Sequence, residues 1–155
     1  EVSDDVDNPR DTRALWDQGL LNGAPAKADV LTHYYLGEAA TCLTRTALVP
    51  GGREVLLAVT VTGGVHVLVP FAAREEREFY QQLEMYMRQE LPNLARRDHL
   101  SFRSYFLPVK HTVDGELCEQ FLALPANKQA EISGDLQLTT DELLKKLEDT
   151  RSAIL

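Results

Sequence analysis

The sequence predicts a mixed fold, β first and then α, in which antiparallel strands are followed by a helical domain. Three observations support this prediction. Between residues 28 and 71, β-branched runs are separated by glycine-containing turn signals. From residue 73 onward, apolar residues recur at spacings of three and four, and residues typical of helix caps precede several of these stretches. At 155 residues, the chain is long enough for one ordinary domain.

The β-rich part is expected to contain four strands joined by short turns. They are predicted over residues 29–36, 39–49, 54–61 and 65–71. The last two turns each contain a glycine pair, and glycine permits positive φ angles. Four such strands form an antiparallel meander, which is the form of one β-propeller blade. A small independent sheet packed on the helices is the alternative, but a lone blade leaves long edges and an uncovered face, so we expect neighbouring blades.

The first predicted helix runs from Arg74 to Leu91. It ends before Pro92, because proline disfavours helical backbone in the residue before it. Its apolar residues fall on one stripe at helical spacing. They are Phe79, Tyr80, Leu83, Met87 and Leu91. The start is unusual, since alanines stand where a Ser, Thr or Asp cap would be expected.

Three shorter helices are expected to follow. Asp114 is the predicted N-cap of a helix over residues 116–124, and Pro125 suits the first turn of the next. Thr139 and Glu142 have the spacing of a capping box ahead of the last helix. Helices of this length are marginal alone, so they must pack on each other or on the sheet.

Composition divides the chain into an acidic, flexible arm over residues 1–13, a β segment over 14–72 and a helical domain over 73–155. The first residue is Glu1 and not methionine, from which we expect a fragment of a longer protein. The net charge of −8 disfavours nucleic-acid binding and suits a basic protein partner. No apolar run is long enough to cross a membrane. The two cysteines lack CxxC spacing and indicate a reducing compartment, nuclear or cytosolic.

Residues with catalytic or metal-binding chemistry are scattered in the sequence. Asp98, His99 and Ser101 are neighbours, but a catalytic triad brings its members together from separate elements. No His or Cys pair has zinc-finger spacing, and neither glycine pair is followed by the Lys-Ser/Thr of a phosphate loop. We therefore expect no catalytic residues, no metal and no cofactor.

The most unusual segment is residues 96–110, which places basic and aromatic side chains together in an acidic chain. It allows three interpretations. The aromatic rings could stack on bases while the arginines hold phosphates. The rings could instead anchor the segment in the core while the arginines pair with nearby carboxylates, which the net charge favours. The segment could also bind a protein, because Arg and Tyr are frequent interface anchors. The candidate partner-binding residues are Arg97, Asp98, Arg103, Tyr105 and Lys110.

Seven short strings carry a resemblance that covers residues 14 to about 151. They are ALWDQGLLNGA (14–24), LVPF (68–71), RDHLSFRSY (97–105), PVK (108–110), DGELCEQF (114–121), NKQ (127–129) and KKLED (145–149). Through these strings the chain resembles the family of the cleavage and polyadenylation specificity factor A subunit and the large damaged-DNA-binding protein. The first and third strings point to the branch of the family that belongs to the splicing factor 3b complex. Residues 1–13 and the last four residues depart from the family pattern.

The resemblance implies an architecture of three β-propellers and a C-terminal helical domain without catalytic activity. This chain would supply the end of the last propeller, over residues 14–72, and the helical domain. The resemblance further implies a nuclear scaffold for pre-mRNA splicing, within the U2 small nuclear ribonucleoprotein, that supports branch-site recognition. Its implied partners are the rest of its own propeller chain, a HEAT-repeat subunit, a small helical subunit and a PHD-finger-like subunit. The alternatives are a scaffold in a histone-acetyltransferase coactivator, a ubiquitin ligase or a polyadenylation factor, or a nucleic-acid-binding module.

Overall fold

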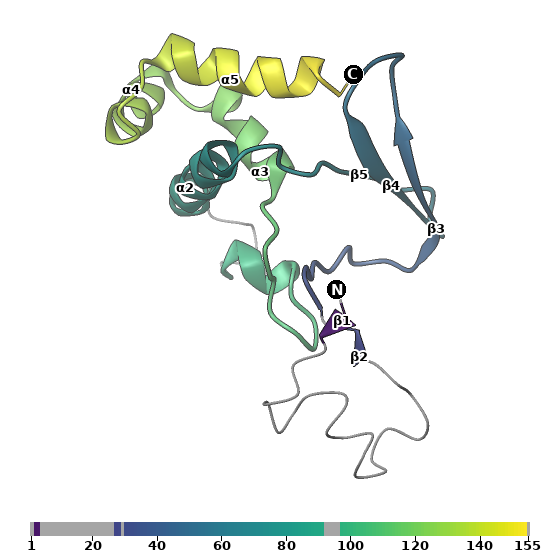
Figure 1. Cartoon of the computed structure of the whole chain (residues 1–155). Helices are drawn as coiled ribbons and strands as arrows, with labels where there is room; N and C mark the ends of the chain where they lie inside the picture. The colour runs from purple at the N-terminus through teal and green to yellow at the C-terminus, as the bar shows by residue number, and fades with distance from the viewer. Residues whose placement is uncertain (1, 4–26, 29, 92–96, 155) are drawn as a thin grey trace.

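A three-stranded antiparallel sheet and a group of helices lie beside one another in this protein (Figure 1). The structure is a computed structural model that describes residues 2–3, 27–28, 30–91 and 97–154. A separate pair of very short strands, β1 (Val2–Ser3) and β2 (Lys27–Ala28), is antiparallel. The rest of the predicted arm over 1–13 and the string at 14–24 lie outside the described residues.

The sheet contains β3 (Ala40–Ala47), β4 (Glu54–Thr60) and β5 (Val65–Leu68) in that order. Both connections are tight hairpin turns with a glycine at positive φ, Gly51 at 77° and Gly63 at 92°. In this region of backbone space a side chain is strained, so glycine is required. Three of the four predicted strands are therefore confirmed, with their order and their turns.

The prediction of a further strand over residues 29–36 is wrong for the described residues 30–36. They do not join the sheet and form only one isolated bridge, between His33 and Lys110. The cause is competition for backbone partners, because the amides of His33 and Tyr35 donate to the carbonyls of Lys110 and Arg103 at 3.0 and 2.9 Å. These acceptors lie far along the chain, which an analysis of local β propensity does not detect. The described meander has three strands where we expected four.

Apolar side chains occur on both faces of the sheet. The strand register places Leu43 beside Ala58 on one face. On the opposite face, Val67 lies beside Leu57 and Val65 beside Val59. An antiparallel sheet at a protein surface normally has one polar face. Here the side chains of Leu43, Val65 and Val67 are exposed in the described structure, on opposite sides of the sheet.

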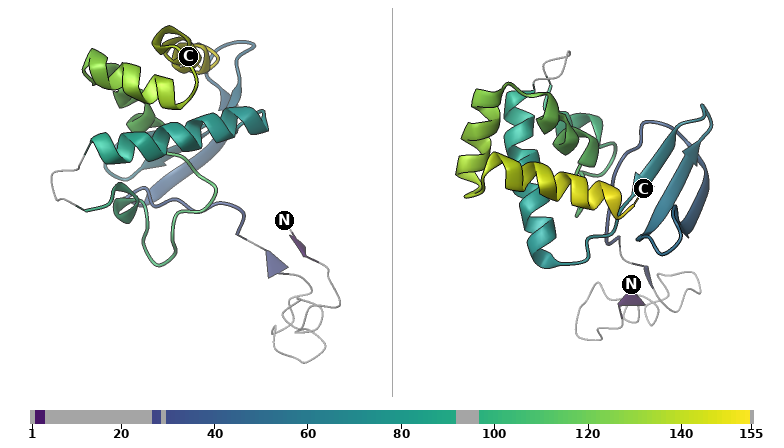
Figure 2. Two further views of the ribbon diagram at one scale, coloured as in Figure 1. Left: turned by 90° about the vertical axis from the view of Figure 1, so that its left-hand side faces the viewer. Right: turned by 90° about the horizontal axis from the view of Figure 1, so that it is seen from above.

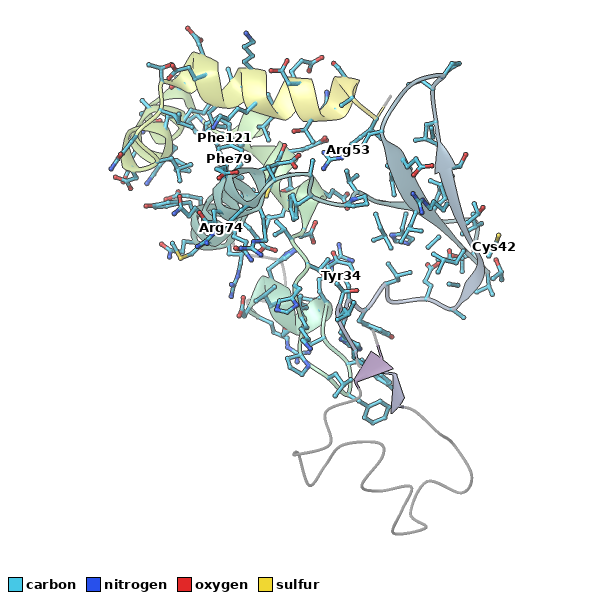
Figure 3. The ribbon with its side chains drawn as sticks, in the orientation of Figure 1. Tyr34, Cys42, Arg53, Arg74, Phe79 and Phe121 are labelled. Carbon is cyan, nitrogen blue, oxygen red and sulfur yellow. The ribbon has the colours of Figure 1, made fainter. Side chains whose placement is uncertain are left out.

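Six helical elements follow the sheet within residues 74–91 and 97–154. They are α2 (Arg74–Glu90), η1 (His99–Phe102), α3 (Gly115–Glu119), η2 (Gln120–Ala123), α4 (Ala126–Asp135) and α5 (Thr140–Ser152). Figure 2 shows α5 crossing α2. The predicted stripe of α2 is confirmed, since four of its five residues are buried and Leu91 packs against them. Phe79 and Phe121, both labelled in Figure 3, lie in this core with Leu83, Met87 and Leu143.

The caps predicted at Asp114 and Thr139 are confirmed, whereas Pro125 is the N-cap of α4 and does not lie in its first turn. Asp114 caps α3 by accepting a hydrogen bond from the amide of Leu117 at 3.2 Å. Thr139 and Glu142 form the complete capping box of α5. The alanine start of α2 has no side-chain cap, and there the carboxylate of Glu76 accepts from the amide of Ala72 at 2.8 Å. No helix in the described residues is both long and apolar enough to span a membrane.

Arg53 connects the sheet to the helices (Figure 3). It lies just before β4, and its amide donates to the carbonyl of Ala153 at the end of α5, at 2.9 Å. Its guanidinium donates to both carboxylate oxygens of Glu76 in α2, at 2.7 and 3.0 Å, and to the carbonyl of Pro70. The hydrogen bonds from Arg53 lower the pKa of Glu76. One residue therefore orients the sheet relative to α2 and α5.

We expect the helical core to be sensitive to truncation at Leu83, which is fully buried on α2. Leu83→Ala leaves a cavity among packed side chains and is expected to lower the free energy of unfolding by about 2–5 kcal/mol. Met85, two residues away on the exposed side of the same helix, provides the control. Met85→Ala is expected to change that free energy by no more than about 0.5 kcal/mol. Urea unfolding followed by circular dichroism measures both, and equal losses would contradict the assigned core.

Candidate protein-interaction site

The connector between α2 and α3, residues 97–114, turns back against residues 30–36. Asp114 lies at the end of this connector and is only 4% exposed. One carboxylate oxygen, Oδ1, caps α3, as described above. The other, Oδ2, accepts three hydrogen bonds: from the Tyr34 hydroxyl at 2.9 Å, from His99 Nε2 at 2.7 Å and from Arg103 Nε at 3.0 Å. Asp114 thus binds groups from three separate segments, and we call this set the Asp114 cluster.

Burial alone would raise the pKa of Asp114, but the hydrogen bonds from His99, from the Leu117 amide and from Tyr34 hold it below its ordinary value. Burial, and secondly the negative charge of Asp114, raises the pKa of the Tyr34 hydroxyl. Asp114 is therefore a charged acceptor at neutral pH, and Tyr34 is a protonated donor. An ionised carboxylate that accepts several hydrogen bonds is a strong local anchor.

A second buried carboxylate lies beside the cluster. Glu84 of α2 accepts a hydrogen bond from the backbone amide of Asp114 at 2.9 Å. Burial raises the pKa of Glu84, and the nearby charge of Asp114 raises it further. The two acids therefore shift in opposite directions, because only Asp114 is surrounded by side-chain donors.

Asp98 and Arg97 lie at the start of the connector. Asp98 accepts from Arg88 of α2, with Nη2 at 2.7 Å from each carboxylate oxygen, and it caps η1 through the amide of Leu100. The hydrogen bonds from Arg88 lower the pKa of Asp98. The guanidinium of Arg97 lies over the ring of Phe102, 5.6 Å from its centroid. Asp98 is thus engaged within the chain, where it fixes the connector to α2.

Arg103 and Lys110 contact the segment 30–36. Arg103 lies over the ring of Tyr34, 5.3 Å from its centroid, in addition to its bond to Asp114. Lys110 forms two backbone hydrogen bonds with His33, and its Nζ donates to the carbonyl of Val30 at 2.5 Å. Within the described residues Lys110 forms no ion pair. Of the two cations, Arg103 is neutralised by a buried carboxylate and Lys110 is not.

Tyr105, Phe106 and Leu107 form the exposed end of the connector, which we call the aromatic tip. The Tyr105 ring stacks on Tyr35 at 5.0 Å and meets Phe106 edge to face at 4.3 Å. Tyr105 is 65% exposed, Phe106 87% and Leu107 49%. The expectation that the rings anchor the connector in the core is therefore not met for the tip, although Arg103 does pair with a local carboxylate. Arg103 and Tyr105 come together around Tyr34 and Tyr35, whereas Asp98 contacts Arg88.

The sequence neighbours Asp98, His99 and Ser101 do not form a triad. His99 donates to Asp114, and Asp98 accepts from Arg88. The hydroxyl of Ser101 is buried and has no hydrogen-bond partner among the described residues. In the same part of the chain, no group of three or more His, Cys, Asp or Glu side chains is placed to hold a metal ion.

Reasoning from the sequence missed two features of the candidate site. Asp114 was predicted only as a helix cap. Tyr34 fell within a predicted strand, and His99 was considered only as a neighbour of Asp98 and Ser101. Tertiary hydrogen bonds across many residues have no local signature. Phe106 lies in the basic and aromatic segment but is not among the candidate residues, although its position between two other large apolar residues, Tyr105 and Leu107, was a usable signal.

Comparison with known proteins relates the chain to one family. A family model described as the CPSF A subunit region matches residues 1–123. Splicing factor 3B subunit 3 of Danio rerio is 52% identical over 152 residues, which cover 97% of this chain and 12% of that protein. Spliceosome-associated protein 130 A of Arabidopsis thaliana is 42% identical over 156 residues, covering 100% of this chain and 13% of that protein. Pre-mRNA-splicing factor prp12 of Schizosaccharomyces pombe is 42% identical over 141 residues, covering 91% and 12%.

We expect Asp114→Asn to destabilise the chain at neutral pH by about 3–5 kcal/mol, because it removes the buried carboxylate that pairs with Arg103 and leaves only the exposed Glu116 carboxylate near that charge, at 4.0 Å. The pKa of Asp114 is lowered on folding from its ordinary value of 3.8. Its stabilisation is therefore fully present above that value and is lost as the pH falls through the lower pKa of the folded state. Urea unfolding at a series of pH values should show the wild type and the variant converging in acid.

Glu84→Gln is the control, because ionisation of Glu84 has the opposite effect on the stability of the folded state. The pKa of Glu84 is raised on folding from 4.5, so its ionised form penalises the folded state above the raised pKa. The penalty is relieved as the pH falls towards 4.5. The glutamine variant keeps the acceptor for the Asp114 amide and is expected to be at least as stable as the wild type at neutral pH. A neutral-pH loss equal to that of Asp114→Asn would contradict the assigned roles.

Proposed function

The chain belongs to the CPSF A subunit family, and from this premise we propose that it is a segment of a splicing scaffold of the splicing factor 3B subunit 3 type. It would act by binding proteins and would carry out no reaction of its own. The spliceosomal relatives from fish, plant and yeast support this proposal. The chain spans only 12–13% of the length of these relatives, so the partners of the whole protein are part of the proposal.

The sheet has apolar residues on both faces, and this observation supports the proposal that it belongs to a larger scaffold. Leu43 on one face and Val65 and Val67 on the other are exposed. Large apolar side chains on two opposite faces indicate that another part of the protein packs against each face. A propeller blade has this arrangement, because a neighbouring blade lies on each side of it. We therefore propose that β3, β4 and β5 belong to a propeller blade, that residues 14–72 complete the last propeller and that 73–155 form the helical domain.

The proposed docking segment is the connector, with a division of roles among its predicted residues. Asp98 and Arg103 would hold the connector in place, because both are engaged by groups of this chain. Tyr105 and Lys110 would contact the partner, because both side chains are exposed. Tyr105 offers an aromatic ring, and Lys110 offers a positive charge that no described carboxylate neutralises. Arg97, which lies over Phe102, would flank them.

The assembly we propose is the splicing factor 3b complex of the nuclear U2 small nuclear ribonucleoprotein, where the protein would support branch-site recognition. The proposed partners are a HEAT-repeat subunit, a small helical subunit and a PHD-finger-like subunit. A scaffold in a coactivator, a ubiquitin ligase or a polyadenylation factor is the alternative within the same family. A nucleic-acid-binding module is favoured only by the exposed rings of the aromatic tip, and the net charge of −8 opposes it.

Affinity purification of the full-length parent protein from nuclear extract in mild salt tests the assembly. Mass spectrometry is expected to recover a HEAT-repeat subunit together with small splicing subunits, and RNA analysis to recover U2 small nuclear RNA. Recovery of a ubiquitin ligase or of polyadenylation factors without splicing subunits would assign the protein to another branch of the family.

A pair of glutamate substitutions tests whether a neighbouring blade covers the sheet. Leu43 and Val61 are each 64% exposed, but Leu43 lies on a face of the sheet and Val61 in the turn after β4. Leu43→Glu is expected to lower the stability of the full-length protein by roughly 2–4 kcal/mol, because it buries a charge between blades. Val61→Glu is expected to stay within about 0.5 kcal/mol of the wild type. Thermal unfolding monitored by scattering and fluorescence measures both, and equal behaviour would exclude a neighbouring blade on that face.

A further inference from the structure

The aromatic tip is held in a defined shape although its side chains face solvent. Its two ends are anchored to the same strand-like segment, through Tyr35 bound to Arg103 and His33 bound to Lys110. Within the loop, the amide of Tyr105 donates to the carbonyl of Leu107 at 3.3 Å. The loop is therefore ordered before any partner binds, which lowers the entropic cost of docking.

The tip presents a continuous set of aromatic rings. Tyr35 stacks on Tyr105, and Tyr105 meets Phe106 edge to face. Phe106, the outermost ring, is the most exposed large apolar residue described in the chain. Single exposed apolar side chains are normal on protein surfaces, whereas three consecutive ones on a rigid projection mark a binding surface. Rigid aromatic side chains that enter a pocket supply most of the affinity at interfaces.

The charges around the tip define the chemistry of its partner. Lys110 is exposed at the base of the tip and forms no ion pair with a described carboxylate. Arg103, by contrast, is neutralised by Asp114. A fitting partner surface therefore combines an apolar groove for Phe106 with carboxylates at its rim. Stacking on nucleic acid is less suited, because Tyr35 already covers one face of Tyr105 and the chain as a whole is acidic.

We propose that the aromatic tip docks into an apolar, carboxylate-rimmed groove formed by another part of the same full-length polypeptide. This rests on the proposed function, in which the chain is a segment of a protein of the length of its relatives. The matched segment is 12% of the Danio rerio protein, so most of that polypeptide lies outside it. A groove on the same polypeptide is always present at high effective concentration, and a permanently exposed tip of this kind would promote aggregation.

Photo-cross-linking within the full-length parent protein, purified without partners, tests the proposal. p-Benzoylphenylalanine replaces Phe106, whose 87% exposure makes the substitution harmless to the fold of this chain. After irradiation, mass spectrometry is expected to find the tip joined to one distant segment of the same polypeptide, with apolar residues and Asp or Glu around the attachment point. The same photoreactive residue at Met85, which is 49% exposed on α2, should give no comparable product.

A charge reversal tests the carboxylate rim. Lys110→Glu places like charges together and is expected to lower the cross-link yield roughly tenfold. Lys145→Glu, an equal change at an exposed position of α5, should leave the yield unchanged. Equal effects of the two reversals would exclude the acidic rim.

Three outcomes would overturn the proposal: no intramolecular product, a product joining two copies of the protein, or transfer of the cross-link to an added 20-nucleotide single-stranded RNA. The last would establish the nucleic-acid interpretation of the tip. Failure here is distinguishable from failure of the proposed function, because the purification experiment identifies assembly partners and this one identifies a contact made when all of them are absent.

Discussion

The buried carboxylate of Asp114 is the interaction on which the rest of the structure depends. It caps α3, accepts from His99 and Arg103 of the connector and accepts from Tyr34, which is 80 residues away in the sequence. Without these donors a carboxylate in this position would be strongly disfavoured, because burial opposes its charge. The donors in turn lie in segments that have little regular structure of their own. The acceptor and the irregular segments therefore stabilise each other.

This dependence explains why the connector can be irregular and still defined. The helical core is held by apolar contacts around Leu83 and Phe121, whereas the connector has no fully buried apolar residue between 97 and 113. Polar bonds replace apolar packing there. Because hydrogen bonds are directional, they fix the orientation of Arg103 and Lys110 more closely than apolar contacts would. The aromatic tip, at the exposed end of the connector, is ordered for the same reason.

Reasoning from the sequence succeeded where structure depends on neighbours in the chain. The stripe of α2, the caps at Asp114 and Thr139 and the glycine turns at Gly51 and Gly63 all follow from spacings of a few residues. It failed for residues 30–36, whose composition suits a strand but whose backbone partners lie in the connector. The candidate partner-binding residues follow from the unusual mixture of basic and aromatic residues, and their role stays a prediction. Arg103 points inward because it pairs with Asp114, whereas Phe106 points to solvent. No pattern of neighbouring residues in the sequence predicts this difference.

The contact between Arg53 and the carbonyl of Ala153 has a consequence for the order in which the chain folds. The helical core uses residues between Phe71 and Leu147, so its contacts span shorter sequence distances than the contact between Arg53 and Ala153. The bond from Arg53 to Ala153 closes a loop that encloses this whole unit, and loop-closure entropy delays such contacts. Synthesis from the N-terminus makes the sheet first, yet the sheet is joined to the end of α5 only when the last turn of that helix has left the ribosome. Until then, the two apolar faces of the sheet have no finished helical unit beside them.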